Sequence, residues 1–156
     1  MLDLVFQNST SDKFPKKDFF EKIISIGAGK LNMKVKHVGI SLNLVEDGRI
    51  KELNKKYRRK NKVTDVLSFP MTDAPSKKLR VTSYELPVTD LGDIFICLPF
   101  AKKQAKSENV SIDRKLAQLT VHGFLHLAGY DHEVSRQEAG KMLNLENKIL
   151  NKLYDW

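Results

Sequence analysis

Residues 121–132 carry the stretch VHGFLHLAGYDH, which decides how the middle of the chain folds. The stretch predicts the end of a helix at Gly129, because glycine permits the left-handed conformation that ends a helix and reverses the chain. His122 and His126 are four positions apart and therefore project from the same face of that helix, with Cβ atoms about 6 Å apart. The reversal at the glycine is expected to return His132 to the first two histidines.

These three histidines predict a metal site. Two imidazoles at this spacing bind one ion at about 2.0–2.1 Å each, and His132 would be the third ligand. Three neutral imidazoles leave one tetrahedral position open, as in catalytic zinc sites, whereas structural zinc sites fill all four positions with protein ligands. The expected cofactor is therefore one zinc ion per chain, although another divalent ion would also suit three imidazoles. The alternative interpretation is a helix with two incidental histidines and a third in the following loop.

The residue after the first histidine separates this stretch from the zinc proteases called metzincins. These enzymes share the histidine and glycine spacing but carry their general-base glutamate directly after the first histidine. Gly123 occupies that position here and has no side chain to accept a proton. Peptide hydrolysis is therefore disfavoured, whereas attack of metal-activated water on a phosphodiester fits the motif. The fourth histidine, His37, is far from the cluster along the chain and is interpreted as a packing or surface residue.

Positive charge is concentrated in one short segment. The 156 residues contain 27 Lys and Arg against 19 Asp and Glu, a formal net charge of +8. Residues 51–62, KELNKKYRRKNK, contain seven basic residues and one acidic residue; they contribute +6 and the other 144 residues contribute +2. Such a strip indicates a polyanionic partner, or else a solvated helix face. Membrane binding is not favoured, because the strip accompanies a candidate active site and no amphipathic anchor.

Hydrophobic periodicity predicts an α+β fold, in which helices cover a small mixed β-sheet and the metal site lies at the end of a central helix. We expect one domain over residues 1–156, because this length supports a single core of ordinary size. Asp47 is expected to cap the second helix. The predicted strands are 2–6, 37–45, 66–69 and 92–98, the predicted helices are 15–31, 47–57, 99–108, 111–128 and 135–154, and 71–90 is an irregular connection.

The compartment predicted from composition and the N-terminus is the cytoplasm. The single cysteine, Cys97, excludes an internal disulfide framework, and its apolar neighbours indicate a buried residue rather than a reactive thiol. The N-terminus has an acidic residue where a signal peptide would have basic ones. The longest apolar run, residues 94–101, is far shorter than the roughly 20 residues of a membrane span.

Three segments of the sequence form one pattern: Tyr57-Arg58 leading through Lys62 to residues 64–70 (TDVLSFP), residues 91–94 (LGDI), and residues 122–132 with Met142 and Glu146 at the expected distances. Together they resemble the YbeY family of bacterial metal-dependent endoribonucleases, which act in ribosomal RNA maturation. The resemblance implies that His122, His126 and His132 bind zinc. It also implies that Arg58 is the functional arginine of the family and engages the scissile phosphate.

By the same resemblance, the substrate is single-stranded precursor ribosomal RNA, especially the 3′ end of the small-subunit RNA, with a role in ribosome quality control. The implied partners are the small ribosomal subunit or ribosomal proteins. Two positions depart from the family pattern, Arg59 and Val63, so Arg59 would share or compete for the role of Arg58. The basic side chains expected to bind RNA are Lys55, Lys56, Arg59, Lys60 and Lys62.

Two other functions stay open from the sequence alone. One is a ribosome-assembly factor that binds RNA without cleaving it and holds a structural zinc; the other is a metallohydrolase of another substrate. The remaining candidates for a general base are Asp65 and Asp93. Asp131 is expected to cap its own turn rather than orient an imidazole. Glu146 is expected to support the last helix, and Phe69 to pack rather than to stack on a base.

Overall fold

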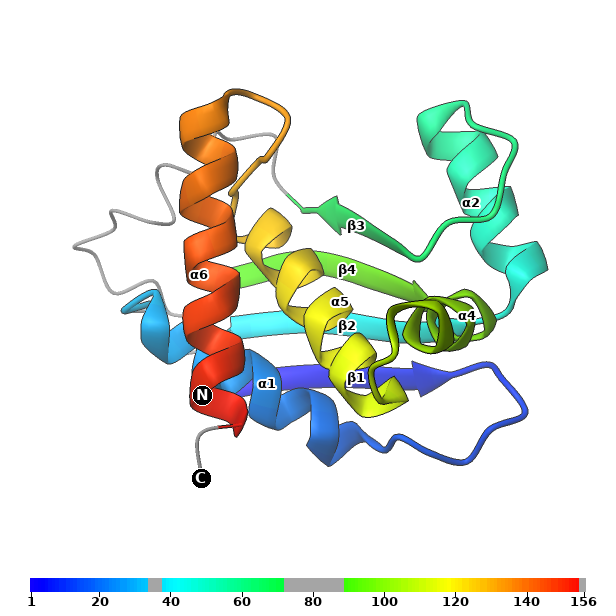
Figure 1. Ribbon diagram of the computed structural model, residues 1–156, viewed down its shortest axis with the longest axis horizontal. Helices are drawn as coiled ribbons and strands as arrows, with labels where there is room; N and C mark the ends of the chain where they lie inside the picture. Colours follow the sequence, from blue (N-terminus) through cyan, green and yellow to red (C-terminus); the bar gives the residue numbers. More distant parts are fainter. Residues whose placement is uncertain (34–37, 72–88, 155–156) are drawn as a thin grey trace.

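The computed structural model describes residues 1–33, 38–71 and 89–154 (Figure 1). Its helices and strands follow one another in the order expected from the periodicity, and most boundaries fall within about two residues of the predicted ones. The elements are β1 (Leu2–Asn8), α1 (Lys17–Lys30), β2 (Val38–Val45), α2 (Asp47–Arg58), β3 (Val66–Pro70), β4 (Thr89–Cys97), α4 (Leu98–Glu108), α5 (Ile112–Leu127) and α6 (Arg136–Tyr154).

Within the described ranges, the four strands form one mixed sheet in the order β1-β2-β4-β3. β1 pairs in parallel with β2, and β2 pairs in parallel with β4, whereas β3 runs antiparallel to β4 and forms the edge. The parallel pairs are joined by crossover segments, as parallel strands require. The expected α+β architecture with a small mixed sheet is therefore confirmed.

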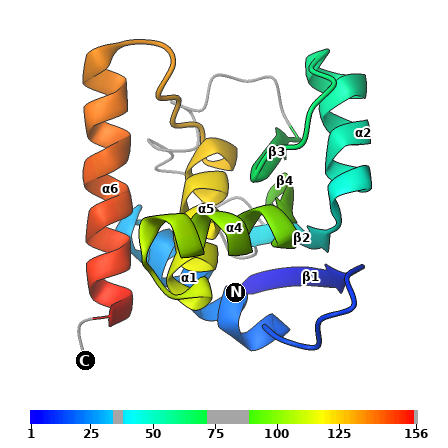
Figure 2. The same ribbon diagram turned by 45° about the vertical axis from the view of Figure 1, so that its right-hand side comes forward.

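The helices lie on both sides of the sheet but not equally. α1, α4, α5 and α6 gather over one face, and α2 lies on the other side, next to β3 and β4 (Figures 1 and 2). The alternation along β2 explains the main layer, because Ile40, Leu42 and Leu44 are buried in the core shared with the helices. A second, smaller core fixes α2 against the sheet; its buried members are Val45, Ile50, Leu53, Leu67 and Cys97.

α5 is the central helix and crosses the sheet at close range. Its N-cap is Ser111, whose hydroxyl accepts a hydrogen bond from the backbone amide of Arg114 at 3.1 Å. A Cβ placed on Gly123 would lie only 3.0 Å from a methyl carbon of Ile94 on β4. The absence of a side chain at this position therefore lets the histidine-bearing helix pack directly on the sheet.

The start of α2 differs from the prediction. The N-cap is Glu46, which makes no side-chain cap hydrogen bond, and Asp47 is the first helical residue. The Asp47 carboxylate instead accepts a hydrogen bond from the Cys97 thiol at 3.2 Å. The expected cap was wrong because this carboxylate is directed toward β4 rather than toward the amides of its own helix.

β4 is longer than predicted at its start and shorter at its end. It begins at Thr89, three residues before the predicted Gly92, and Leu98 already belongs to α4. The register against β2 shifts between Gly39 and Ile40, which adds a residue to β4 at this point. Gly92 takes a φ of 123°, and a Cβ there would overlap the carbonyl oxygen of Phe69 on β3. The irregularity breaks the alternation that the prediction used.

Two expectations concern residues outside the described ranges. His37 is one of them, and most of the predicted irregular connection, residues 72–88, is the other. No helix within the described part of the chain is both long enough and apolar enough to cross a membrane.

Candidate metal centre and phosphate cleft

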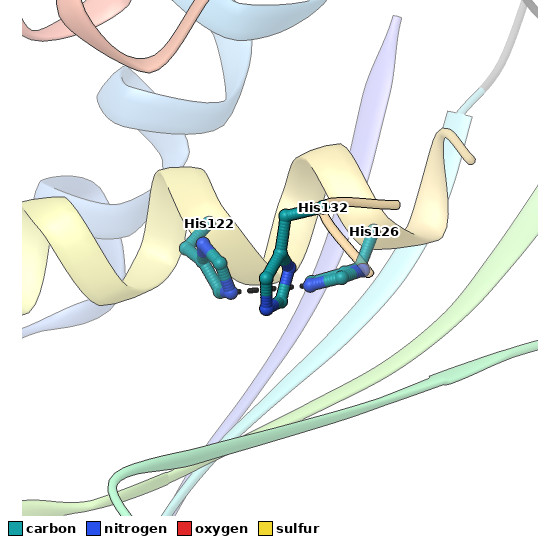
Figure 3. Close-up of side chains that lie close together, drawn as sticks. All are labelled: His122, His126 and His132. Carbon is teal, nitrogen blue, oxygen red and sulfur yellow. Dashed lines mark hydrogen bonds between the residues drawn. The ribbon is translucent and has the colours of Figure 1, made fainter. Parts of the chain in front are cut away.

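The three histidines of the quoted stretch converge, as the spacing predicts. His122 and His126 project from one face of α5, and His132 in the following loop lies against both (Figure 3). Ring centroids are 4.6 Å apart for the first pair, and His132 lies 5.2 Å from His122 and 5.1 Å from His126. One ring nitrogen from each residue lies within 4.8 Å of the others, so the group could hold a metal ion.

The end of α5 produces this return. Gly129 takes a φ of 100°, the conformation in which glycine meets little steric resistance. Its amide donates to the His126 carbonyl at 3.0 Å, and the Tyr130 amide donates to the Leu125 carbonyl at 2.9 Å. These bonds satisfy carbonyl groups at the end of the helix while the chain turns back, so the third histidine reaches the first two.

The distance between the first two histidines and the donor set fit a tetrahedral ion. Two nitrogens at about 2.0–2.1 Å from zinc at the tetrahedral angle would be about 3.3 Å apart. The Nε2 atoms of His122 and His126 are 3.1 Å apart. Burial, followed by the neighbouring imidazoles, lowers the pKa of His126 to about 4, so this ring is neutral at physiological pH. A neutral imidazole is the form that coordinates a metal.

Glu146 holds the first of these histidines and was not predicted to do so. Its carboxylate accepts a hydrogen bond from Nδ1 of His122 at 2.6 Å. Because the carboxylate can only accept, Nδ1 carries the proton and Nε2 is left to face the other rings. The sequence contains one usable signal: an apolar residue, Met142, lies one turn earlier on α6, so Glu146 shares the face of the helix that buries Met142.

Asp131 has the turn role that was expected. Its Oδ1 accepts a hydrogen bond from the backbone amide of Glu133 at 2.8 Å. The bond closes the loop around His132, the residue between them in sequence. Asp131 therefore shapes the segment that presents the third histidine.

The histidines open into a cleft of about 790 Å³ that reaches across β3 to the end of α2. β3 lies between α5 and α2 in both ribbon views (Figures 1 and 2). The lining side chains are therefore contributed by two segments that are distant in sequence, residues 57–70 and 122–133. They are Tyr57, Arg58, Lys60, Thr64, Asp65, Val66, Ser68, Phe69, Pro70, His122, His126, Leu127, Gly129, Tyr130, Asp131, His132 and Glu133.

Only some of the basic residues in the strip of residues 51–62 line this cleft. Arg58 and Lys60 line it, whereas Arg59 is the left-handed C-cap of α2, with a φ of 57°, and is not among the lining residues. The buried side chain of Asn54 donates to the Lys62 carbonyl at 3.0 Å and so fixes the loop after the helix. Three further lysines were predicted to bind RNA but are not among the described residues that line the cleft. They are Lys55, Lys56 and Lys62.

The two candidates for a general base differ in their access to the cleft. Asp65 lines the cleft, but its carboxylate already accepts from the Val66 amide at 2.7 Å and from the Gln104 side-chain amide at 3.1 Å. Asp93 pairs with Phe69 in the β3–β4 register and is not among the described residues that line the cleft.

The position that carries the general-base glutamate in metzincins has no room for such a side chain here. Gly123 faces Ile94 in the core and not the histidines, so a longer side chain would meet the sheet. The missing protease base is therefore a consequence of how α5 packs, and not only of the residue type.

Comparison with known proteins agrees with this geometry. The family model described as Endoribonuclease YbeY matches residues 5–154. A Sulfurihydrogenibium protein named Endoribonuclease YbeY is 41% identical over 96% of this chain and 88% of its own length. A protein of the same name from Persephonella marina is 39% identical over 93% of this chain and 85% of its own length.

A solved structure has the same fold. The solution structure of TM1509 from Thermotoga maritima superimposes with a TM-score of 0.64 over 98% of this chain and 90% of that chain. The two sequences are 23% identical, so this likeness concerns the arrangement of helices and strands.

Proposed function

The chain belongs to the YbeY family, and we propose that it is a metal-dependent endoribonuclease that cleaves single-stranded RNA. We further propose that residues 1–156 form one such domain. The observation that carries the proposal is the shared cleft: three convergent imidazoles line it together with Arg58. A metal ligand set facing a guanidinium suits a phosphodiester, because the two bind different oxygens of the same phosphate.

The proposed metal ligands are His122, His126 and His132, with one zinc ion per chain. Three imidazoles also suit other divalent ions, and bound-metal analysis of the purified protein identifies the ion. When bound, such an ion supplies Lewis acidity and lowers the pKa of water into the neutral range. Glu146 keeps the proton of His122 on Nδ1 and orients the ring.

Arg58 is the proposed catalytic residue on the opposite side of the cleft. Its guanidinium is planar and permanently charged, so it donates two parallel hydrogen bonds to phosphate oxygens. Lys60 lines the same cleft and adds positive charge there. Lys55, Lys56, Arg59 and Lys62 belong to the same strip, and we propose that they hold the RNA backbone outside the scissile position.

The proposed biological substrate is precursor ribosomal RNA, with cleavage at the 3′ end of the small-subunit RNA and a role in ribosome quality control. The curated relatives carry the name Endoribonuclease YbeY, which supports the RNA-cleaving activity. The small ribosomal subunit or its proteins are the proposed partners, and the cytoplasm is the proposed compartment. Mapping the 5′ ends produced from precursor small-subunit RNA tests the cleavage position.

Cleavage of a labelled single-stranded RNA by purified protein tests the activity. We expect cleavage that stops with chelator, returns when zinc is added back, and is absent in His126→Ala. Arg58→Ala should lower the turnover by about 10²- to 10³-fold, the usual effect of removing one donor to developing negative charge. The matched control is Arg59→Ala, which removes the neighbouring arginine outside the cleft lining and should retain more activity than Arg58→Ala.

Two results would contradict the proposal. Cleavage that survives both chelation and His126→Ala would exclude the metal mechanism. Salt-sensitive RNA binding without turnover, together with unfolding when zinc is removed, would instead support the assembly factor with a structural zinc.

A further inference from the structure

Tyr57 is exposed at a position where the pattern of its helix predicts burial. The buried residues of α2 are Ile50, Leu53 and Asn54, which lie on one stripe of the helix. Tyr57 continues this stripe by one turn, yet 57% of it is exposed. The helix extends beyond the small second core at this point, so the aromatic ring stands at the edge of the sheet rather than inside it.

The Tyr57 ring packs against an aromatic residue of the sheet, which in turn packs against a second one. Its centroid lies 5.1 Å from that of Phe69 on β3, at an interplanar angle of 59°. Phe69 in turn lies 5.8 Å from Phe95 on β4, at 73°. Both phenylalanines are half-buried beside the second core. The tyrosine is therefore held in place by the sheet while much of its surface faces solvent.

Positive charge surrounds the exposed ring. The ammonium group of Lys56 lies 5.2 Å from the ring centroid of Tyr57. Arg58 follows it in sequence, and Tyr57, Arg58 and Lys60 line the same cleft as the three histidines. An aromatic surface beside cations is the combination that binds single-stranded nucleic acid, since bases stack on the ring and phosphates meet the charges.

We propose that Tyr57 is a stacking platform for an unpaired nucleobase next to the phosphate that Arg58 engages. The proposal rests on the proposed function for the identity of that phosphate. The platform explains the proposed preference for single-stranded RNA. A base inside a duplex is stacked on its neighbours and has no free face to stack on Tyr57. Stacking tolerates every base, so the platform binds RNA without selecting its sequence.

The competing interpretation is that Tyr57 only completes the packing of α2. Leucine would then serve as well, because it also covers Phe69 with apolar surface. A platform requires a flat aromatic ring, so phenylalanine should replace tyrosine and leucine should not. Replacement of one stacking side chain weakens binding by roughly 5- to 150-fold, which is the measurable range.

The test uses the metal-loaded protein and a short single-stranded 2′-O-methyl RNA that contains 2-aminopurine, with gel electrophoresis to verify that the RNA stays intact. Stacking quenches the fluorescence of this base, so affinity and stacking are read in one titration. We expect Tyr57→Leu to bind roughly 5- to 150-fold more weakly and to lose the quenching, whereas Tyr57→Phe keeps both. Tyr154→Leu, an aromatic replacement at the end of α6, is the matched control and should leave both unchanged.

Salt dependence separates stacking from charge. Tyr57→Leu should leave the slope of log affinity against log salt unchanged, because it removes no phosphate contact. Lys60→Ala should reduce that slope by about one if its ammonium group contacts a phosphate. Circular dichroism of each variant verifies the fold.

Failure of this inference is distinguishable from failure of the proposed function, because no turnover is needed. Tyr57→Leu with wild-type affinity and quenching would overturn the platform, even if the enzyme cleaves RNA. A wild type that shows neither binding nor quenching at low salt would also overturn it. A wild type that binds with quenching but never cleaves RNA would leave the platform intact and remove the nuclease.

Discussion

The cleft has two walls that differ in how their side chains are held. The histidine wall consists of His122, His126 and His132, and Glu146 and the Asp131 turn fix its members by hydrogen bonds. The basic wall consists of the last turn of α2 and the loop through residue 62, and its charged side chains are exposed. Among the described residues, no ion pair joins a basic side chain of this wall to a carboxylate.

The difference fits the task that we propose for each wall. Metal ligands must lie within a few tenths of an ångström of fixed positions, so they require a rigid helix and supporting contacts. Attraction of a phosphate backbone depends on charge density, which exposed lysines supply. We therefore expect single substitutions to abolish what the histidine wall does, and only to weaken what the basic wall does.

The largest effect is expected for His126→Ala. Two imidazoles cannot hold the ion as three do, so bound metal should fall from one per chain to near zero and metal-dependent cleavage should disappear. RNA affinity should change little, because the basic wall is intact. Metal analysis and filter binding of the same sample measure both; equal losses of metal and RNA affinity would show that the two walls are not separable.

A smaller effect is expected for Glu146→Gln. The amide keeps the size of the side chain but replaces a charge-assisted bond to His122, so metal affinity should fall by about 10- to 100-fold. Competition with a chromophoric chelator measures this affinity. Glu21→Gln, on the surface of α1, is the matched control and should bind metal as the wild type does. Unchanged affinity in Glu146→Gln would mean that the histidine wall does not depend on this support.

The strand between the walls, β3, offers a test of how closely it packs against β4. Gly92→Ala places a Cβ against the Phe69 carbonyl at a φ of 123°, so β3 must move away from β4. We expect a loss of about 2–3 kcal/mol of unfolding free energy in a denaturant titration. Gly48→Ala, in α2 with nothing within 4 Å of the added Cβ, should instead be neutral or stabilising by up to about 1 kcal/mol. Equal stabilities would contradict the close approach of the two strands.

The smallest effect is expected for Lys55→Ala. This exposed lysine lies outside the described lining of the cleft, so its loss should weaken RNA binding only about two- to threefold at low salt, with normal metal content. A much larger loss of RNA binding would mean that Lys55 makes a specific contact with the substrate rather than only adding charge. Titrations at two salt concentrations distinguish a general charge effect from a specific contact.

The difference between local and tertiary contacts explains which features could be predicted from the sequence. Helices and strands with strong periodicity were predicted within about two residues, and the spacing of the histidines with Gly129 led directly to the histidine cluster that could hold a metal ion. These features are local, since the residues that determine them are neighbours in the chain. The β4 irregularity and the Asp47 contact with Cys97 depend on tertiary neighbours, and both were missed.

The candidate site shows the same difference between local and tertiary contacts. Glu146 was expected only to support α6, because its partner is 24 residues away in sequence. The orientation of the two adjacent arginines also needed the structure: the left-handed cap at Arg59 separates it from Arg58 at the end of the helix. The exposure of Tyr57 depends on where α2 ends relative to the sheet, which no pattern in the helix itself reveals.

The buried thiol has a practical consequence for measuring how far apart the two walls stand. Burial raises the pKa of Cys97 to about 12, and its thiol donates a hydrogen bond to the Asp47 carboxylate. At neutral pH the native cysteine therefore reacts slowly with maleimides and other alkylating reagents. Spectroscopic labels attached to cysteines introduced on α2 and α6 would report the opening of the cleft in the otherwise unaltered chain.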